Sequence, residues 1–167
     1  GRAAVTLSLI DGIQNLLPYG LEQSVQSGSS NLVDAYKKSE LEVGTGLGIF
    51  ALSAVIVDKA EPSEALKSNI AWSIGTKNPK YLISSLQLDA FRNGEDVHKE
   101  IDVKAEKGAY FTIQDLVLEA NSEENWLLIS NVNQNITTIQ DISNKIKNEA
   151  SLATLIQDDI NLGTTHL

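Results

Sequence analysis

The stretch Asp89-Ala-Phe-Arg-Asn-Gly-Glu-Asp-Val-His-Lys-Glu100 has two incompatible interpretations, and the choice between them decides the fold predicted around it. As an EF-hand loop, it places Asp89, Asn93 and Glu100 at ligand positions and Gly94 at the position of the sharp turn. As a turn, Asn93-Gly94 joins two β-strands in a hairpin and needs no metal. The flanking residues discriminate between the two.

The hairpin interpretation gives a regular alternation of apolar and polar residues along both arms of residues 82–105. With Asn93-Gly94 as the two-residue loop, Leu86 lies opposite Ile101 on an apolar face, and Asp89 lies opposite His98 on a polar face. A slip of one residue would destroy this alternation. The hairpin therefore predicts that five residues belong to the core: Leu82, Leu86, Leu88, Ile101 and Val103.

The calcium interpretation fails on the chemistry of the loop. Phe91 and Val97 occupy ligand positions but have no side-chain oxygen. The flanks alternate like strands, whereas an EF-hand needs a helix on each side. We therefore expect a hairpin, and we predict no metal site.

The composition describes a folded acidic protein. The 167 residues are 42% hydrophobic and 21% charged, with a net charge of −9. Such a balance is typical of a globular domain with a core of its own. This acidic charge argues against nucleic acid as a partner, because neutralising the phosphates needs clustered Lys and Arg. With no cysteine, neither a disulfide nor a thiolate metal site can form.

The chain begins Gly1-Arg2 and contains no methionine. We expect a processed product, a fragment or a trimmed chain. There is no run of 18 apolar residues, so no membrane-spanning helix is predicted.

The first 40 residues have helical spacing. Apolar residues recur near one helical face of residues 3–17, and Pro18 would end that helix. A second short helix is predicted over 21–26, and a third could follow the Ser/Gly-rich linker 27–31 and continue through Lys38.

The middle of the chain has the spacing of strands. Residues 43–57 carry no charge and end in a β-branched run, which is typical of a strand buried on both faces. Further strands are predicted over 69–76, 109–120 and 126–132. With the hairpin, this makes about six strands between residues 43 and 132, joined by short polar turns and therefore mainly antiparallel.

A helical stripe of isoleucines follows residue 135. One amphipathic helix is predicted over residues 136–161, with a break at Asn148 or Ser151. Its apolar face either packs on the sheet or joins a partner helix. The residues we expect to bind a partner are Ile139, Ile142, Ile146, Ile156 and Ile160.

Other motifs favour structure over chemistry. Residues 44–48, Gly-Thr-Gly-Leu-Gly, lack the preceding strand, following helix and later acid of a dinucleotide site, and they fit a flexible strand entry. Paired acidic residues, such as Glu123-Glu124, fit a solvated surface. His98 has no nucleophile in a recognisable arrangement. Trp72 and Trp126 are expected to anchor the core.

We therefore expect an α+β fold in a single domain, residues 1–167. It would consist of an antiparallel sheet or small sandwich over 41–132, with helical segments at 1–40 and 133–162. The expected function is a non-catalytic binding or assembly module, with no cofactor and no small-molecule substrate. It would contact a protein partner, or a second copy, through the C-terminal helix. The less favoured alternative is a lipid-binding or membrane-active, toxin-like protein that uses the N-terminal helix and residues 43–57.

Overall fold

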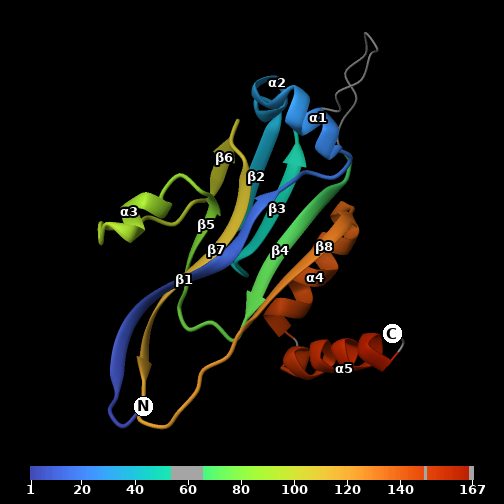
Figure 1. The fold of residues 1–167 in the computed structure, drawn as a ribbon. Coiled ribbons are helices and arrows are strands. Elements are labelled where there is room, and N and C mark those ends of the chain that lie inside the picture. Colours follow the sequence, from blue (N-terminus) through green and yellow to red (C-terminus); the bar gives the residue numbers. More distant parts are fainter. Residues whose placement is uncertain (54–65, 149, 166–167) are drawn as a thin grey trace.

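The computed structural model describes residues 1–53, 66–148 and 150–165, and it has two antiparallel sheets (Figure 1). The three-stranded sheet has the order β1 (Val5–Leu16), β7 (Gly108–Leu118), β5 (Lys80–Ser84). The five-stranded sheet has the order β6 (Asp102–Lys104), β2 (Lys37–Glu42), β3 (Leu47–Leu52), β4 (Ser68–Ile74), β8 (Leu127–Gln134). The helices are α1 (Gln23–Gly28), α2 (Ser30–Asp34), α3 (Leu88–Arg92), α4 (Ile136–Asn148) and α5 (Leu152–Thr165). The predicted α+β class with mainly antiparallel sheet is confirmed.

The two sheets share a central core. Side chains alternate along β7, so Tyr110 points toward the five-stranded sheet and Phe111 points away from it. Tyr110 packs with Phe50 of β3 and Ala71 of β4. Its hydroxyl donates to the carbonyl oxygen of Gly46 at 2.8 Å, in the turn between β2 and β3. This contact ties the two sheets together.

The outer face of the five-stranded sheet is covered by α4. Leu47, Ile70 and Trp72 point outward from β3 and β4, and Ile139 of α4 is buried against them. Trp72 also donates from its indole N–H to Asn131 Oδ1 of β8 at 3.0 Å. Trp72 is therefore a core residue, as expected.

The outer face of the three-stranded sheet carries a smaller core. Leu82, Phe111 and Ile113 are buried there under Leu88 of α3 and Val97 of the segment that follows it. The described part of the chain is thus layered, with short helical structure on one sheet and α4 on the other.

The helix predicted over residues 3–17 is wrong, because residues 5–16 form β1. Val5, Leu7 and Leu9 also recur at a period of two, and the strand finds its partner in β7 more than ninety residues later, with Ile10 opposite Ile113. Gly12 permits a close approach, since a Cβ there would lie 2.1 Å from the Tyr110 carbonyl oxygen. The predicted helical segment 1–40 also contains the start of β2, although α1 and α2 do form.

The predicted hairpin is also wrong. Leu88–Arg92 form α3, and Asn93-Gly94 ends this helix, with Gly94 at φ +73°. The N–H of Gly94 donates to the Phe91 carbonyl and the N–H of Glu95 to the Ala90 carbonyl, which is the Schellman pattern of a helix end. Asn-Gly suits this helix end as well as it suits a hairpin turn.

The second arm of the predicted hairpin pairs elsewhere. β6 lies beside β2, with Val103 opposite Ser39, and not beside β5. Glu100 instead accepts hydrogen bonds at 2.8 Å from the backbone N–H groups of both Ile83 and Ser84. A carboxylate therefore takes the place of a paired strand at this point of β5.

The core predicted from the hairpin is correct only in part. Leu82 and Leu88 are buried and Val103 is half-buried, but Leu86 and Ile101 are exposed. The polar face is also not formed, because Asp89 pairs with Arg92 at 2.8 Å and not with His98.

Other predicted strands are confirmed. β4, β7 and β8 correspond to the strands expected over 69–76, 109–120 and 126–132. β3 occupies part of the uncharged stretch 43–57, of which residues 54–57 lie outside the described residues. The C-terminal helix is present as two helices, α4 and α5, with the break near the predicted positions.

Candidate partner-binding surfaces

The five isoleucines expected to bind a partner do not share one environment. Ile139 is buried, and Ile142 and Ile146 are half-buried, all on the five-stranded sheet. Ile156 of α5 is half-buried against the same cluster, whereas Ile160 is 46% exposed. The stripe on α4 is therefore used within the chain, and only the far end of the stripe on α5 remains open.

A carboxylate of β2 fastens α4 to the sheet. Glu42 accepts hydrogen bonds from Ser143 at 2.6 Å and from Lys147 at 2.5 Å, both on α4, and from Thr45 at 2.5 Å. Burial alone would raise the pKa of Glu42, but the hydrogen bonds from Lys147, Ser143 and Thr45 outweigh it and hold the pKa below its usual range. The charged form of Glu42 is thus stabilised by the position of α4.

The second C-terminal helix is much less covered. None of the described side chains of α5 is buried. Leu155 is 51% exposed and Leu162 is 57% exposed, and these two leucines are seven residues apart, so they lie two turns apart on the same side of the helix. Figure 1 shows α5 turning away from the direction of α4 toward the rim of the molecule. Leu155 and Leu162 therefore form an exposed apolar strip on one side of α5.

The charge of α5 has one sign. Asp158 and Asp159 lie at the middle of the helix, and residues 152–165 contain no Lys, Arg or His. On a helical wheel, Asp159 falls between the line of Leu155 and Leu162 and the line of Leu152 and Ile156. Any partner of this face must accommodate carboxylates as well as leucine side chains.

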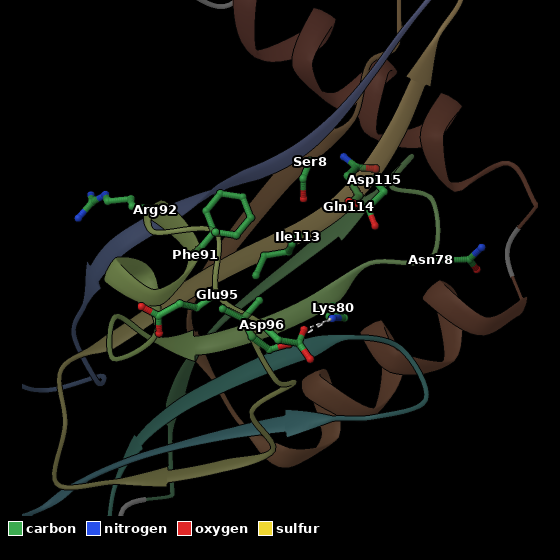
Figure 2. A pocket seen from close by; sticks show the side chains of 12 residues that line it. Ser8, Asn78, Lys80, Phe91, Arg92, Glu95, Asp96, Ile113, Gln114 and Asp115 are labelled. Carbon is green, nitrogen blue, oxygen red and sulfur yellow. Dashed lines mark hydrogen bonds and ion pairs between the residues drawn. The ribbon is translucent and has the colours of Figure 1, made fainter.

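A pocket of about 470 Å³ lies on the outer face of the three-stranded sheet (Figure 2). Phe91 of α3 and Ile113 of β7 form its apolar part. Ser8 of β1 and Asp115 of β7 line it beside each other, because these two residues are directly opposite in the strand pair. The pocket therefore reaches the edge strand of the sheet.

Charged residues surround this pocket, and the acidic ones are in excess. Asp115, Glu95 and Asp96 line it together with Lys80 and Arg92. Lys80 donates to Asp96 at 3.3 Å and to the Val97 carbonyl at 3.2 Å. The hydrogen bond from Lys80 to the Asp96 carboxylate lowers the pKa of Asp96. Arg92 is paired with Asp89 and extends away from Phe91 in Figure 2.

A second cavity, of about 380 Å³, lies between the end of β1 and α1. Lys37 and Gln26 are among its lining residues and are buried, and Lys37 Nζ lies 2.7 Å from Asp34 Oδ1. Lys37 Nζ is held by its ion pair with Asp34, whereas Gln26 Oε1 has no hydrogen-bond partner within the described residues. Both atoms have almost no accessible surface, so neither opens onto the cavity. These two buried polar atoms are therefore not available to a ligand in this cavity.

The remaining motifs have structural positions. Residues 44–46 lie in the turn between β2 and β3, and Gly46 adopts φ +73° against the ring of Tyr81. Trp126 is half-buried and donates from its indole N–H to Asp11 Oδ2 of β1 at 2.7 Å. His98 is exposed.

In the part of the chain that the structure describes, no group of three or more His, Asp or Glu side chains is arranged to hold a metal ion. Likewise, none of the described helices has the length and apolarity needed to cross a membrane. No protein-family model matches the sequence, and no curated protein matches it.

Two features of these surfaces were not predicted from the sequence. Leu155 and Leu162 were not included in the expected site, although their heptad spacing is visible in the sequence. The free edge of β1 was missed because residues 3–17 fit a helix. The open surfaces are therefore offset from the predicted one, toward the end of α5 and toward β1.

Proposed function

We propose that this protein is a non-catalytic binding module that acts through protein–protein contacts made by α5. The observation that supports it is the difference between the two C-terminal helices. Ile139 of α4 is buried on the sheet, whereas Leu155, Ile160 and Leu162 of α5 are about half exposed. Leu155 and Leu162 share one side of α5, whereas Ile160 lies on the side of Ile156. Exposed apolar residues that share a side of a helix are typical of a surface that meets a partner.

The charge of α5 favours a partner helix with basic flanks over a second copy of the chain. In an antiparallel pair of α5 helices, the central Asp158 and Asp159 of one copy would face those of the other. Like charges at such a contact are destabilising. Lysine or arginine side chains beside an apolar seam would instead pair with these carboxylates. The net charge of −9 acts in the same direction at longer range.

The same charges argue against a lipid surface as the occupant. Helices that lie on anionic bilayers carry Lys and Arg on their polar face, and α5 has none. The N-terminal helix on which the membrane-active alternative relied is a strand, β1. The lipid alternative therefore becomes an outcome of the test, with vesicles of anionic and neutral composition as its probes.

The test uses two designed helical peptides of three heptads, with leucine at positions a and d. One carries lysine at e and g, and the other carries glutamate there. We expect the intact protein to bind the lysine peptide and not the glutamate peptide, and the double variant Leu155→Lys/Leu162→Lys to lose this binding. Leu86→Lys, at an exposed leucine outside α5, is the matched control.

Light scattering on the intact chain completes the test. A monomer that binds neither peptide nor vesicles would overturn the proposal. An oligomer that the double variant Leu155→Lys/Leu162→Lys abolishes would show that α5 is the contact surface. It would also show that the partner is a second copy of the chain, and this would overturn the proposal of a basic partner helix.

A further inference from the structure

β1 is an edge strand of the three-stranded sheet. Among the described residues, β1 pairs with β7 only, so its other edge has no neighbouring strand. In an antiparallel pair, roughly half of a strand's residues direct N–H and C=O away from the neighbour. In Figure 1 the first half of β1 runs along the outer rim of the molecule beside β7.

This edge lacks the usual protection against strand pairing. Exposed edges are commonly blunted by lysine, proline, bulges or short length. β1 has twelve residues with neither lysine nor proline, and its register shift falls at the far end, between Gln14 and Leu16. Its one charged residue, Asp11, accepts the indole N–H of Trp126. By contrast, the edge strand β6 has three residues.

The two faces of β1 differ in chemistry. Val5, Leu7 and Leu9 lie on one face, and the small polar residues Thr6 and Ser8 lie on the other. Along residues 5–9, an added strand would therefore meet apolar side chains on one side and small hydroxyl side chains on the other. Ile10 follows on the hydroxyl side and packs against the core of the three-stranded sheet. This pattern fits an extended segment that alternates apolar and polar residues.

The pocket beside Ser8 favours a basic side chain at the polar positions of an added strand. On the Thr6–Ser8 face, Asp115 lies directly across from Ser8 on β7. An added strand would place its own side chain on the far side of Ser8, roughly 10 Å from the β7 backbone at two strand spacings. A long Lys or Arg side chain can extend over the short Ser8 side chain to the Asp115 carboxylate. Glu95 and Asp96 line the same pocket, and its two basic residues are already paired, Lys80 with Asp96 and Arg92 with Asp89.

We propose that the free edge of β1 binds an extended peptide segment by strand addition, and that a Lys or Arg of this segment enters the pocket lined by Ser8 and Asp115. Backbone hydrogen bonds along β1 supply affinity, and the acidic pocket selects the basic side chain. This surface is separate from α5, and its use does not depend on a contact made there.

The probe is a blocked seven-residue peptide that alternates valine and lysine, titrated against the full chain. One control peptide replaces lysine with glutamate, and another keeps the lysines but has proline at the central valine. We expect the valine–lysine peptide to bind, and the proline peptide to bind at least about tenfold more weakly, because proline removes a backbone donor. Equal binding of both lysine peptides would overturn strand addition.

Matched variants test the pocket. Asp115→Lys should weaken binding about tenfold or more, whereas Glu119→Lys makes the same change of charge just beyond the end of β7 and should weaken it less than about threefold. Ser8→Trp should obstruct the pocket, and Thr6→Trp, on the same face of β1, is its control. Equal effects within either pair, or no binding of the valine–lysine peptide to the unaltered chain, would overturn the proposal. Leu155→Lys/Leu162→Lys should leave this binding unchanged, which separates it from the α5 contact.

Discussion

Tyr110 of β7 donates its hydroxyl to the carbonyl oxygen of Gly46 at 2.8 Å, and the same oxygen atom of Tyr110 lies 3.3 Å from Ser73 Oγ. The hydroxyl thus joins the three-stranded sheet to the five-stranded sheet inside their shared core. Burial raises the pKa of Tyr110, so the hydroxyl stays protonated and remains a donor.

Tyr110→Phe should reduce the free energy of unfolding by about 1–3 kcal/mol, because it leaves the Gly46 carbonyl without this donor in a buried site. Urea denaturation followed by tryptophan fluorescence measures the change. Tyr36→Phe, at a partly exposed tyrosine, is the control and should have little effect. Equal losses in the two variants would show that the Tyr110 hydroxyl does not contribute to stability.

Gly12→Ala and Gly163→Ala should have opposite consequences. A Cβ at Gly12 would lie 2.1 Å from the Tyr110 carbonyl oxygen, so β1 would have to separate from β7. A Cβ at Gly163 of α5 meets nothing within 4 Å. We expect Gly12→Ala to cost about 1–3 kcal/mol, and Gly163→Ala to be neutral or stabilising by up to about 1 kcal/mol. Thermal unfolding of both variants distinguishes these results, and a neutral Gly12→Ala would contradict the β1–β7 register.

Ile139→Ala should destabilise the protein by about 2–4 kcal/mol, because Ile139 fills the contact between α4 and the sheet. Ile136→Ala, three residues earlier at a side chain that is 74% exposed, is the matched control and should change stability by less than about 0.5 kcal/mol. If both substitutions proved equally mild, α4 would not be packed on the sheet as described.

The attachment of α4 should weaken at low pH. The pKa of Glu42 is lowered in the folded protein, so its charged form contributes stability that is fully present above the ordinary glutamate pKa of about 4.3. This contribution is lost as the pH falls from there through the lowered pKa. We expect Glu42→Gln to be less stable than the unaltered chain at pH 7, and the difference to shrink below about pH 4.

Thermal unfolding between pH 3 and pH 7 measures this dependence. Glu123→Gln, in the exposed connection between β7 and β8, is the control. A stability difference for Glu42→Gln that does not change with pH would contradict the role of the Glu42 carboxylate.

The sequence predicted the strands whose apolar residues leave no good alternative. Residues 68–74 have a strand-forming composition, and a strand places Ile70 and Trp72 on one face. A helix over these residues would not bring these two side chains to the same face. The stripe of α4 was likewise visible in the isoleucine spacing. In these elements the local pattern and the tertiary packing agree.

The two wrong predictions, the helix over residues 3–17 and the hairpin over residues 82–105, concern segments whose local pattern fits two structures. Val5, Leu9 and Ile13 fit a helical face and also fit alternate positions of a strand, and pairing with β7 decides between them. Asn93-Gly94 fits a hairpin turn and also the end of α3. The N–H groups of Ile83 and Ser84 in β5 donate to the Glu100 side chain, and a contact of this kind has no periodic signature in the sequence.

The partner-binding role of the C-terminal helix stays a prediction, but the structure shows which of its apolar side chains are open to solvent. An amphipathic C-terminal helix was expected to meet a partner, but how its isoleucines divide between the sheet and solvent depends on the break between α4 and α5. The free edge of β1 and its acidic pocket depend on non-local pairing, so the sequence alone could not indicate them.

Amide hydrogen exchange with and without the lysine-bearing helical peptide distinguishes α5 from α4 as the helix that contacts the partner. We predict that residues 152–165 exchange fast in the free protein and become protected when the peptide binds, whereas the amides of α4 are protected in both states. Protection that appears on α4 and leaves α5 unchanged would show that α5 is not the contact helix.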